Sequence, residues 1–193
     1  MPLRRTAAVI ATATLAVLAV TPVAQGREQP TTTVSEAAAG WLARQLVDGD
    51  HFEIVAEGVA YPDQGLTLDG LFALTAAGVA SDSADRITAW LAQPAVIDGY
   101  LHSGMPTESY AGAHAKLALA VQARGQDPTA FAGVDLIAGL TALQDASGRF
   151  KDKSQFGEFS NGFTQAFAVL ALDRWKGAPA AAVDYLVGTQ CPD

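Results

Sequence analysis

The sequence has little that could crosslink it, bind nucleic acid or cross a membrane. Its 193 residues include one cysteine, Cys191, so no disulfide can form within the chain. The 20 acidic and 12 basic side chains give a net charge of −8, which argues against nucleic-acid partners because these attract basic surfaces. β-Branched runs and sustained period-two alternation are absent. With 50% hydrophobic residues and abundant alanine, we expect one helical domain with a real core.

The first 26 residues have the pattern of a secretory signal peptide. Arg4 and Arg5 precede an uncharged apolar stretch over residues 7–20, and residues 24–26 (Ala-Gln-Gly) provide a small-x-small cleavage site. The stretch is shorter than the roughly 20 residues that a transmembrane helix needs. We therefore expect a secreted or cell-surface protein whose mature part begins with a flexible lead over residues 27–35.

The rest of the chain repeats with a period of about 48 residues. Four segments share an apolar helical face that ends in glutamine, namely at Gln45, Gln93, Gln144 and Gln190. After each of the first three, a polar loop containing glycine leads to a second apolar helix. These second helices are expected to open at Gly70, Gly112 and Gly162. The predicted unit is a helix–loop–helix hairpin.

Helical periodicity and helix-ending glycines support this unit. Leu136, Leu140 and Leu143 fall at positions i, i+4 and i+7, as they do on one face of a helix. Three glycines follow the second helices, where a residue with positive φ commonly ends a helix: Gly78, Gly125 and Gly177. A single hairpin cannot bury its own apolar face, so stacked neighbours must supply the core.

One repeat carries a family resemblance. Leu140 lies four residues before Gln144, and residues 148–150 (Gly-Arg-Phe) follow. This resembles the glutamine–tryptophan repeat of squalene–hopene and oxidosqualene cyclases, with Phe150 in place of tryptophan. Residues 185–190 match the first half of the same repeat. The first two repeats are one or two residues short before the glutamine and have no Gly-x-aromatic tail.

The resemblance implies an all-α fold of the prenyltransferase and squalene-cyclase (terpenoid-cyclase) type over residues 36–193. In that α/α toroid, outer and inner helices alternate around a central cavity. The glutamine ties the end of an outer helix to the next turn and the aromatic side chain stacks on it. It therefore implies a structural role for the repeat residues: Gln45, Gln93, Gln144, Gln190 and Phe150.

About three and a half hairpins fit in the chain, whereas a closed toroid of this family has about five to seven. We therefore expect an incomplete ring, so that the chain is part of a longer protein. The alternative is a half-ring that associates with itself through its open apolar face.

The acidic motifs of the family's enzymes are missing. Its cyclases protonate an alkene or epoxide with an Asp-x-Asp-Asp cluster, and Asp48-Gly49-Asp50 is the nearest match, in a glycine turn. An Asp-Asp-x-x-Asp motif for magnesium and diphosphate is also absent.

Metal and cofactor motifs are missing as well. The family's zinc enzymes have an aspartate two residues before a cysteine, and here Thr189 takes that place before Cys191. His51, His102 and His114 lack metal-ligand spacing. We therefore expect neither a metal nor a cofactor, and assign no catalytic residue.

Five residues near the expected openings of the second helices are candidates for a ligand-binding rim: Asp69, Glu108, Tyr110, Glu158 and Phe159. Such acids could line the mouth of an apolar cavity or act as the carboxylate pair of a glycosidase. Alternatively, they cap free N–H groups at helix N-termini.

Three function classes remain. The first is an exported, non-catalytic binding module for a bulky apolar or amphipathic molecule, such as a lipid or, as the resemblance implies, a corrinoid. The second is a terpene cyclase or prenyltransferase whose catalytic residues lie in a missing C-terminal half. The third is an (α/α)-barrel enzyme acting on glycans, which the three tryptophans of the mature chain disfavour because Trp41, Trp90 and Trp175 lie on expected packing faces.

Overall fold

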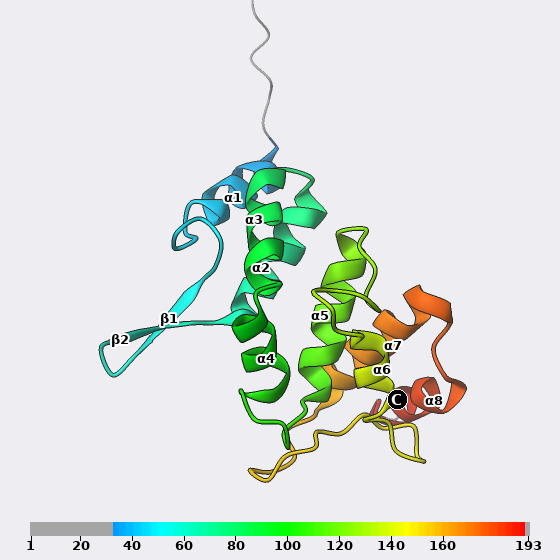
Figure 1. The fold of residues 1–193 in the computed structure, drawn as a ribbon. Helices are drawn as coiled ribbons and strands as arrows, with labels where there is room; N and C mark the ends of the chain where they lie inside the picture. Colours follow the sequence, from blue (N-terminus) through cyan, green and yellow to red (C-terminus); the bar gives the residue numbers. More distant parts are fainter. Residues whose placement is uncertain (1–32, 192–193) are drawn as a thin grey trace, which may run out of the picture. The chain divides into compact units, whose positions relative to one another are not determined.

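The computed structural model describes residues 33–191, which form eight helices and one two-stranded hairpin (Figure 1). The elements follow in the order α1 (Val34–Ala43), β1 (Glu53–Ala56), β2 (Val59–Pro62), α2 (Gln64–Ala77), α3 (Ser81–Leu91), α4 (Pro94–His102), α5 (Ala111–Ala123), α6 (Leu136–Thr141), α7 (Gly162–Lys176) and α8 (Ala180–Gly188). The expected signal peptide, most of the lead and residues 192–193 lie outside the described residues. Helix α1 begins at Val34, two residues inside the expected lead.

Local sequence explains where several helices begin. Thr33 and Glu36 form a capping box at the start of α1, and Asn161 accepts hydrogen bonds from the backbone N–H groups of Phe163 and Thr164 at the start of α7. Asp63 caps α2 in the same way through Leu66 N. Each of these side chains satisfies a backbone donor that the helix itself leaves free.

Glycines with positive φ follow the ends of α2, α5 and α7, as the sequence predicts. The φ angles are 67° at Gly78, 72° at Gly125 and 100° at Gly177. Helices α5 and α7 also begin at or next to the expected positions, at Ala111 and Gly162. The predicted mainly helical character and these boundaries are confirmed.

Three helices pack in a row, with α5 between α2 and α7. Helices α1 and α3 pack against α2, α6 packs against α5, and α8 packs against α7. Because α5 has neighbours on so many sides, nine of its 13 residues are buried. Helix α7 contacts α5 and α8 and buries five of its 15 residues.

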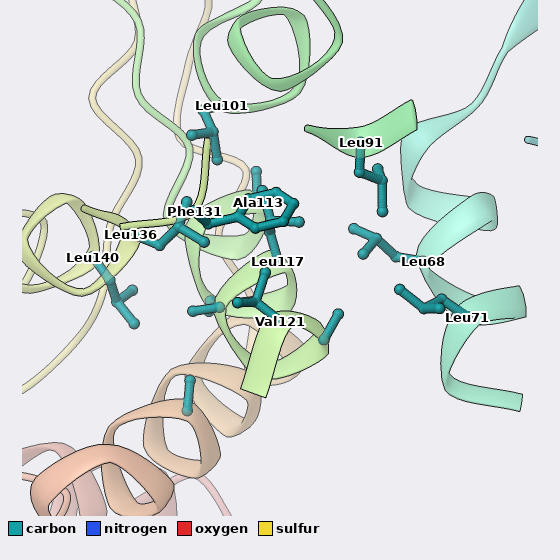
Figure 2. Close-up of a cluster of buried hydrophobic side chains, with 14 of the residues drawn as sticks. Leu68, Leu71, Leu91, Leu101, Ala113, Leu117, Val121, Phe131, Leu136 and Leu140 are labelled. Atoms are coloured by element: carbon teal, nitrogen blue, oxygen red, sulfur yellow. The ribbon is translucent and has the colours of Figure 1, made fainter. Parts of the chain in front are cut away.

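The core lies between these helices (Figure 2). Leu68 and Leu71 of α2 lie on one side of it with Leu91, and Leu117 of α5 lies near Leu136 on the other side. Glycines allow two close approaches: a Cβ at Gly70 would overlap the ring of Phe52, and one at Gly139 would overlap the ring of His114. The small residues are therefore required for helix and loop contact at these points.

The hairpin β1–β2 corrects the prediction that the chain is all-α. It pairs Glu53 with Pro62 and Ala56 with Val59 in antiparallel register and extends away from the helices (Figure 1). Its turn residues Glu57 and Gly58 both have positive φ, the feature of a type I′ turn. Most of its side chains are exposed on both faces, so the apolar alternation that would reveal a half-buried strand is absent.

Two helical boundaries also differ from the prediction. The segment after Gln93 is expected to be a loop, but residues 94–102 form α4, with Pro94 at its first turn and no conflict with the helix there. Helix α2 begins at Gln64, six residues before the expected opening at Gly70. Gly70 is instead a buried contact point in the middle of the helix, next to Phe52.

Candidate functional site

Partly buried, mainly apolar side chains of α2, α5 and α7 meet the exposed carboxylate of Asp69 at one place, which we call the three-helix face. It consists of Asp69 and Phe72 from α2, Lys116 and Leu119 from α5, and Phe167 from α7. The rings of Phe72 and Phe167 stack with centroids 6.4 Å apart. Because these two helices lie on opposite sides of α5 in the row, the stacked pair shows that all three helices contribute to one surface.

One ion pair lies on this apolar face. Lys116 Nζ is 2.7 Å from Asp69 Oδ1 and donates to the carbonyl oxygen of Gly65 at 2.9 Å. The same ammonium lies 5.9 Å from the centre of the Phe167 ring. The lysine is mostly buried while the aspartate is mostly exposed, so a molecule on the face would meet aromatic carbon and a half-solvated ion pair together.

Tyr100 of α4 is a polar neighbour of this pair. Burial raises the pKa of its phenol, and the negative charges of Asp69 and Asp63 raise it further. The phenol is therefore neutral at physiological pH and remains a hydrogen-bond donor.

A second cluster of acids organises the long loop before α7. Glu108 Oε1 accepts from Gln155 N at 3.1 Å, and Glu158 Oε1 accepts from Ser160 N at 2.9 Å. Asp152 accepts from Ala111 N at 2.8 Å, which caps the start of α5 from a distant part of the chain. These three carboxylates hold backbone donors of the loop and of a helix N-terminus.

The protonation of these acids follows from their hydrogen bonds. A hydrogen bond with the Ser154 hydroxyl, with others from Gln155 and Tyr110, holds the pKa of Glu108 below its usual value, although the residue is only 1% exposed. Burial acts to raise the pKa of Glu158, but hydrogen bonds from Ser160 outweigh it and lower the pKa. Burial raises the pKa of Asp152.

A glycosidase needs one carboxyl group with a raised pKa as its general acid. Glu108 and Glu158, the two acids considered for that role, are shifted in the opposite direction. Their environment suits ionised acceptors of loop N–H groups, and the carboxylate that caps a helix N-terminus in this cluster is Asp152.

The structure divides the predicted rim into two parts. Tyr110 donates to Glu108 Oε2 at 3.0 Å, and Glu158 and Phe159 lie in the same loop network, with Phe159 N donating to Asp152. Asp69 lies on the three-helix face, paired with Lys116.

The four repeat glutamines have different surroundings. Gln144 Nε2 donates to Gly148 O at 3.4 Å, whereas Gln45 Nε2 donates to Trp41 O within its own helical end. Gln93 lies at the N-cap of α4 without a side-chain capping bond. Gln190 follows α8 and is exposed.

A different glutamine makes the strongest connection in this region. Gln165 of α7 is buried, accepts from the N–H of Phe150 at 3.0 Å, and donates to Gly148 O at 3.0 Å and Ala182 O at 2.9 Å. It ties the loop around the buried ring of Phe150 to both α7 and α8.

His114 lies within hydrogen-bond distance of a serine but lacks the third group of a catalytic triad among the described residues. His114 Nε2 lies 3.1 Å from Ser109 Oγ, but its Nδ1 is buried without a hydrogen-bond partner among the described residues. A serine nucleophile needs a base that a third group orients through that nitrogen. Burial, with a smaller effect from His102, lowers the pKa of His114 to about 4. His102 itself pairs with Asp98 at 3.0 Å.

Among residues 33–191, no three His, Cys, Asp or Glu side chains are grouped so that they could hold a metal ion. Among the same residues, no helix is both long and apolar enough to span a bilayer.

Lys116, Asp152 and Gln165 were missed by sequence reasoning. Asp152 binds Ala111 N from 41 residues away, and Lys116 binds Gly65 O from 51 residues away. Two hydrogen bonds of Gln165 join groups 17 residues apart in the sequence. The one available signal is that Lys116 is the only Lys, Arg, Asp or Glu within the mainly apolar segment 111–123, because a charge at such a position needs a partner.

Comparison with known proteins yields no match: no family model matches the sequence, and neither the curated proteins nor the solved structures contain a significantly similar chain.

Proposed function

We propose that this chain is a non-catalytic binding module that holds a bulky apolar or amphipathic molecule on the three-helix face. The observation that carries the proposal is the surface itself, on which Phe72 and Phe167 stack beside the Asp69–Lys116 ion pair. A ligand of this kind would cover aromatic carbon while its polar part meets the ion pair.

The proposal includes an α/α toroid-type arrangement of the helices. It is supported by the row α2–α5–α7, in which each helix packs against at least one further helix from outside the row. In such an arrangement the three-helix face would line the concave side. The resemblance of residues 140–150 to the squalene-cyclase repeat supports the same arrangement.

The proposal also includes export of the protein. The basic start, apolar stretch and small-residue site of residues 1–26 support secretion, so the ligand would be met outside the cytoplasm or at the cell surface.

The test is ligand-dependent stabilisation of the purified chain. We expect its melting temperature to rise with cyanocobalamin or with a micellar lysolipid, because a ligand that binds only the folded state stabilises it. Phe167→Ala should weaken the binding by at least about tenfold, since an aromatic anchor in the contact is lost. The matched control, Phe156→Ala, removes an exposed ring outside the face and should leave the affinity unchanged.

A further variant separates apolar from amphipathic ligands. Lys116→Met keeps the length of the side chain and removes its charge, so it should weaken binding of the lysolipid and spare a purely apolar probe such as squalene. A chain that is not stabilised by any of these three compounds would contradict the proposal.

A further inference from the structure

The ion pair on the three-helix face is asymmetric. The Lys116 side chain is only 14% exposed, and its ammonium is occupied by the Asp69 carboxylate and by the carbonyl oxygen of Gly65. The Asp69 side chain is 59% exposed, and within residues 33–191 its Oδ2 has no hydrogen-bond partner. A molecule that reaches the face therefore meets a carboxylate, whereas the lysine is turned toward the protein.

The carboxylates near this pair outnumber the cations. Helices α2 and α4 contain no lysine or arginine, and Lys116 is the only one in α5. Burial raises the pKa of the Tyr100 phenol, and the negative charges of Asp69 and Asp63 raise it further, so both carboxylates lie close to this side chain. Two carboxylates against one ammonium give this part of the surface a net negative charge.

The basic residues of α7 are engaged elsewhere. Arg174 and Lys176 lie in the last turn of the helix, about two turns beyond Phe167. Arg174 donates to the carbonyl oxygen of Gln122, and Lys176 lies over the ring of Trp175. These contacts direct both cations to groups other than the carboxylates of the face.

Apolar side chains flank the exposed carboxylate. Leu66, which is 42% exposed, and Phe72 lie three residues before and three residues after Asp69, so they share its side of α2. The Phe72 ring stacks on the Phe167 ring with an angle of 5° between their planes. Aromatic ring faces attract cations, and the Lys116 ammonium already lies 5.9 Å from the centre of the Phe167 ring.

We propose that the molecule held on the three-helix face is an amphipathic cation, such as a long-chain ammonium compound. Its ammonium group donates a charge-assisted hydrogen bond to Asp69 Oδ2, while Lys116 holds the other carboxylate oxygen in place. Its hydrocarbon tail covers Leu66 and the phenylalanine rings. This inference rests on the proposed function, because it names the class of ligand for the same site.

Three amphiphiles with the same tail and different head groups test the preference for cations. Isothermal titration calorimetry of the full chain at neutral pH compares dodecylammonium, dodecanoate and the uncharged dodecyl maltoside, each below its micelle concentration. We expect the dissociation constant of dodecylammonium to be at least about tenfold lower than that of dodecanoate. This comparison uses the unaltered chain, so it does not depend on whether a variant folds.

A variant then assigns the preference to one carboxylate. Asp69→Asn keeps the shape of the side chain and removes its charge, so it should raise the dissociation constant of dodecylammonium at least about tenfold and change that of dodecyl maltoside less than about twofold. The matched control, Glu57→Gln, removes one negative charge from the turn of the hairpin, which extends away from the helices (Figure 1). It should leave both dissociation constants unchanged.

Circular dichroism confirms that the variants fold. If the loss of its partner at Lys116 unfolds Asp69→Asn, then Asp63→Asn replaces it, because asparagine also caps a helix N-terminus. Asp63→Asn should weaken the binding of dodecylammonium and spare dodecyl maltoside, since it removes the second negative charge near the site.

The outcomes separate this inference from the proposed function. If dodecanoate binds as tightly as dodecylammonium or more tightly, the face still binds amphiphiles and only the preference for cations is overturned. The same conclusion follows if Glu57→Gln weakens the binding of dodecylammonium as much as Asp69→Asn does, because the net charge of the chain would then attract the cation. If none of the three compounds binds, the proposed function fails and this inference fails with it.

Discussion

At the scale of single residues, a buried glutamine holds the loop between α6 and α7. Gln165 satisfies the N–H of Phe150, a group that is otherwise buried without a partner. The repeat glutamine Gln144 makes a longer and less buried bond to Gly148 O. Gln165 of α7 therefore contributes more hydrogen bonds to this connection than Gln144, the glutamine expected from the repeat pattern.

Replacing Gln165 tests this difference. Gln165→Leu leaves the buried N–H of Phe150 unpaired, so we expect it to lower the free energy of unfolding by at least about 2 kcal/mol. Gln144→Leu is the matched change and should cost less than about 1 kcal/mol, since Gln165 still binds Gly148 O. Urea unfolding of both variants measures the difference, and equal losses would contradict this assignment.

His114 makes the stability depend on pH. Its pKa in the folded chain is about 4, below the roughly 6.5 of an exposed histidine, because burial disfavours the charged ring. The unfolded chain therefore binds the proton more tightly. The stability that this residue provides is complete above pH 6.5 and decreases as the pH falls toward 4.

We expect His114 to cost the protein up to roughly 2 kcal/mol of stability between pH 7 and pH 5. His114→Leu should flatten that part of the curve of unfolding free energy against pH. His102→Gln should keep most of the slope, since burial is the larger cause of the shift. An unchanged slope in His114→Leu would show that another group titrates there.

At the scale of elements, close contact between a loop and α8 depends on a glycine. Gly148 has a φ of 89°, and a Cβ there would overlap the backbone of Ala181. Gly78 has a similar φ of 67° but open space around it. Both positions therefore need a residue that tolerates positive φ, but only Gly148 also lacks space for a side chain.

Comparing Gly78→Ala with Gly148→Ala separates the cost of backbone strain from the cost of overlap with neighbouring atoms. Gly78→Ala should cost about 1 kcal/mol, the usual penalty for a side chain in the left-handed region. Gly148→Ala should cost at least about 2 kcal/mol more, because α8 must also move. Thermal and urea unfolding of both variants test this, and similar costs would mean that α8 adjusts freely.

The hairpin β1–β2 is the element least connected to the core. Its base is closed by a hydrogen bond from Asp63 N to Phe52 O, while Ile54, Val55, Val59 and Tyr61 are exposed. Replacing residues 55–60 with Asn-Gly should therefore change the unfolding free energy by less than about 1 kcal/mol. A large loss on urea unfolding would show that the hairpin supports the helices.

Local signals in the sequence predicted some elements and not others. Gly78, Gly125 and Gly177 mark helix ends because positive φ is a local requirement. The hairpin was missed because its strands are exposed on both faces and have no buried side to create alternation. Helix α4 was missed although Pro94 is a valid first-turn residue, because the repeat pattern placed a loop there.

In the candidate site too, the sequence predicts contacts between near neighbours but not contacts between helices. Glu108 and Tyr110 are near in sequence and contact each other, as their position before one helix suggests. Asp69 pairs with Lys116 of another helix, which depends on how α2 packs against α5. Periodicity places such residues on a face, but only the packing shows which faces meet.

At the scale of the whole molecule, removal of the predicted signal peptide would change the net charge. Residues 1–26 carry Arg4 and Arg5 and no acid, so their removal takes the net charge from −8 to −10. The mature chain would then repel copies of itself over long distances, and any association would need short-range contact.

Export can be tested on the same chain. Expressed with its own N-terminus in a secreting bacterium, the protein should reach the medium or cell surface with Gln25 or Arg27 as its first residue, which intact mass and N-terminal sequencing determine. Leu15→Arg places a charge in the apolar stretch and should leave the uncut chain in the cytoplasm, whereas Leu15→Val keeps the stretch apolar and should be exported normally. An uncut cytoplasmic product from the unaltered chain would move the ligand of the three-helix face to the cytoplasm, and the corrinoid and lipid probes would then have to be replaced by cytoplasmic amphipathic molecules.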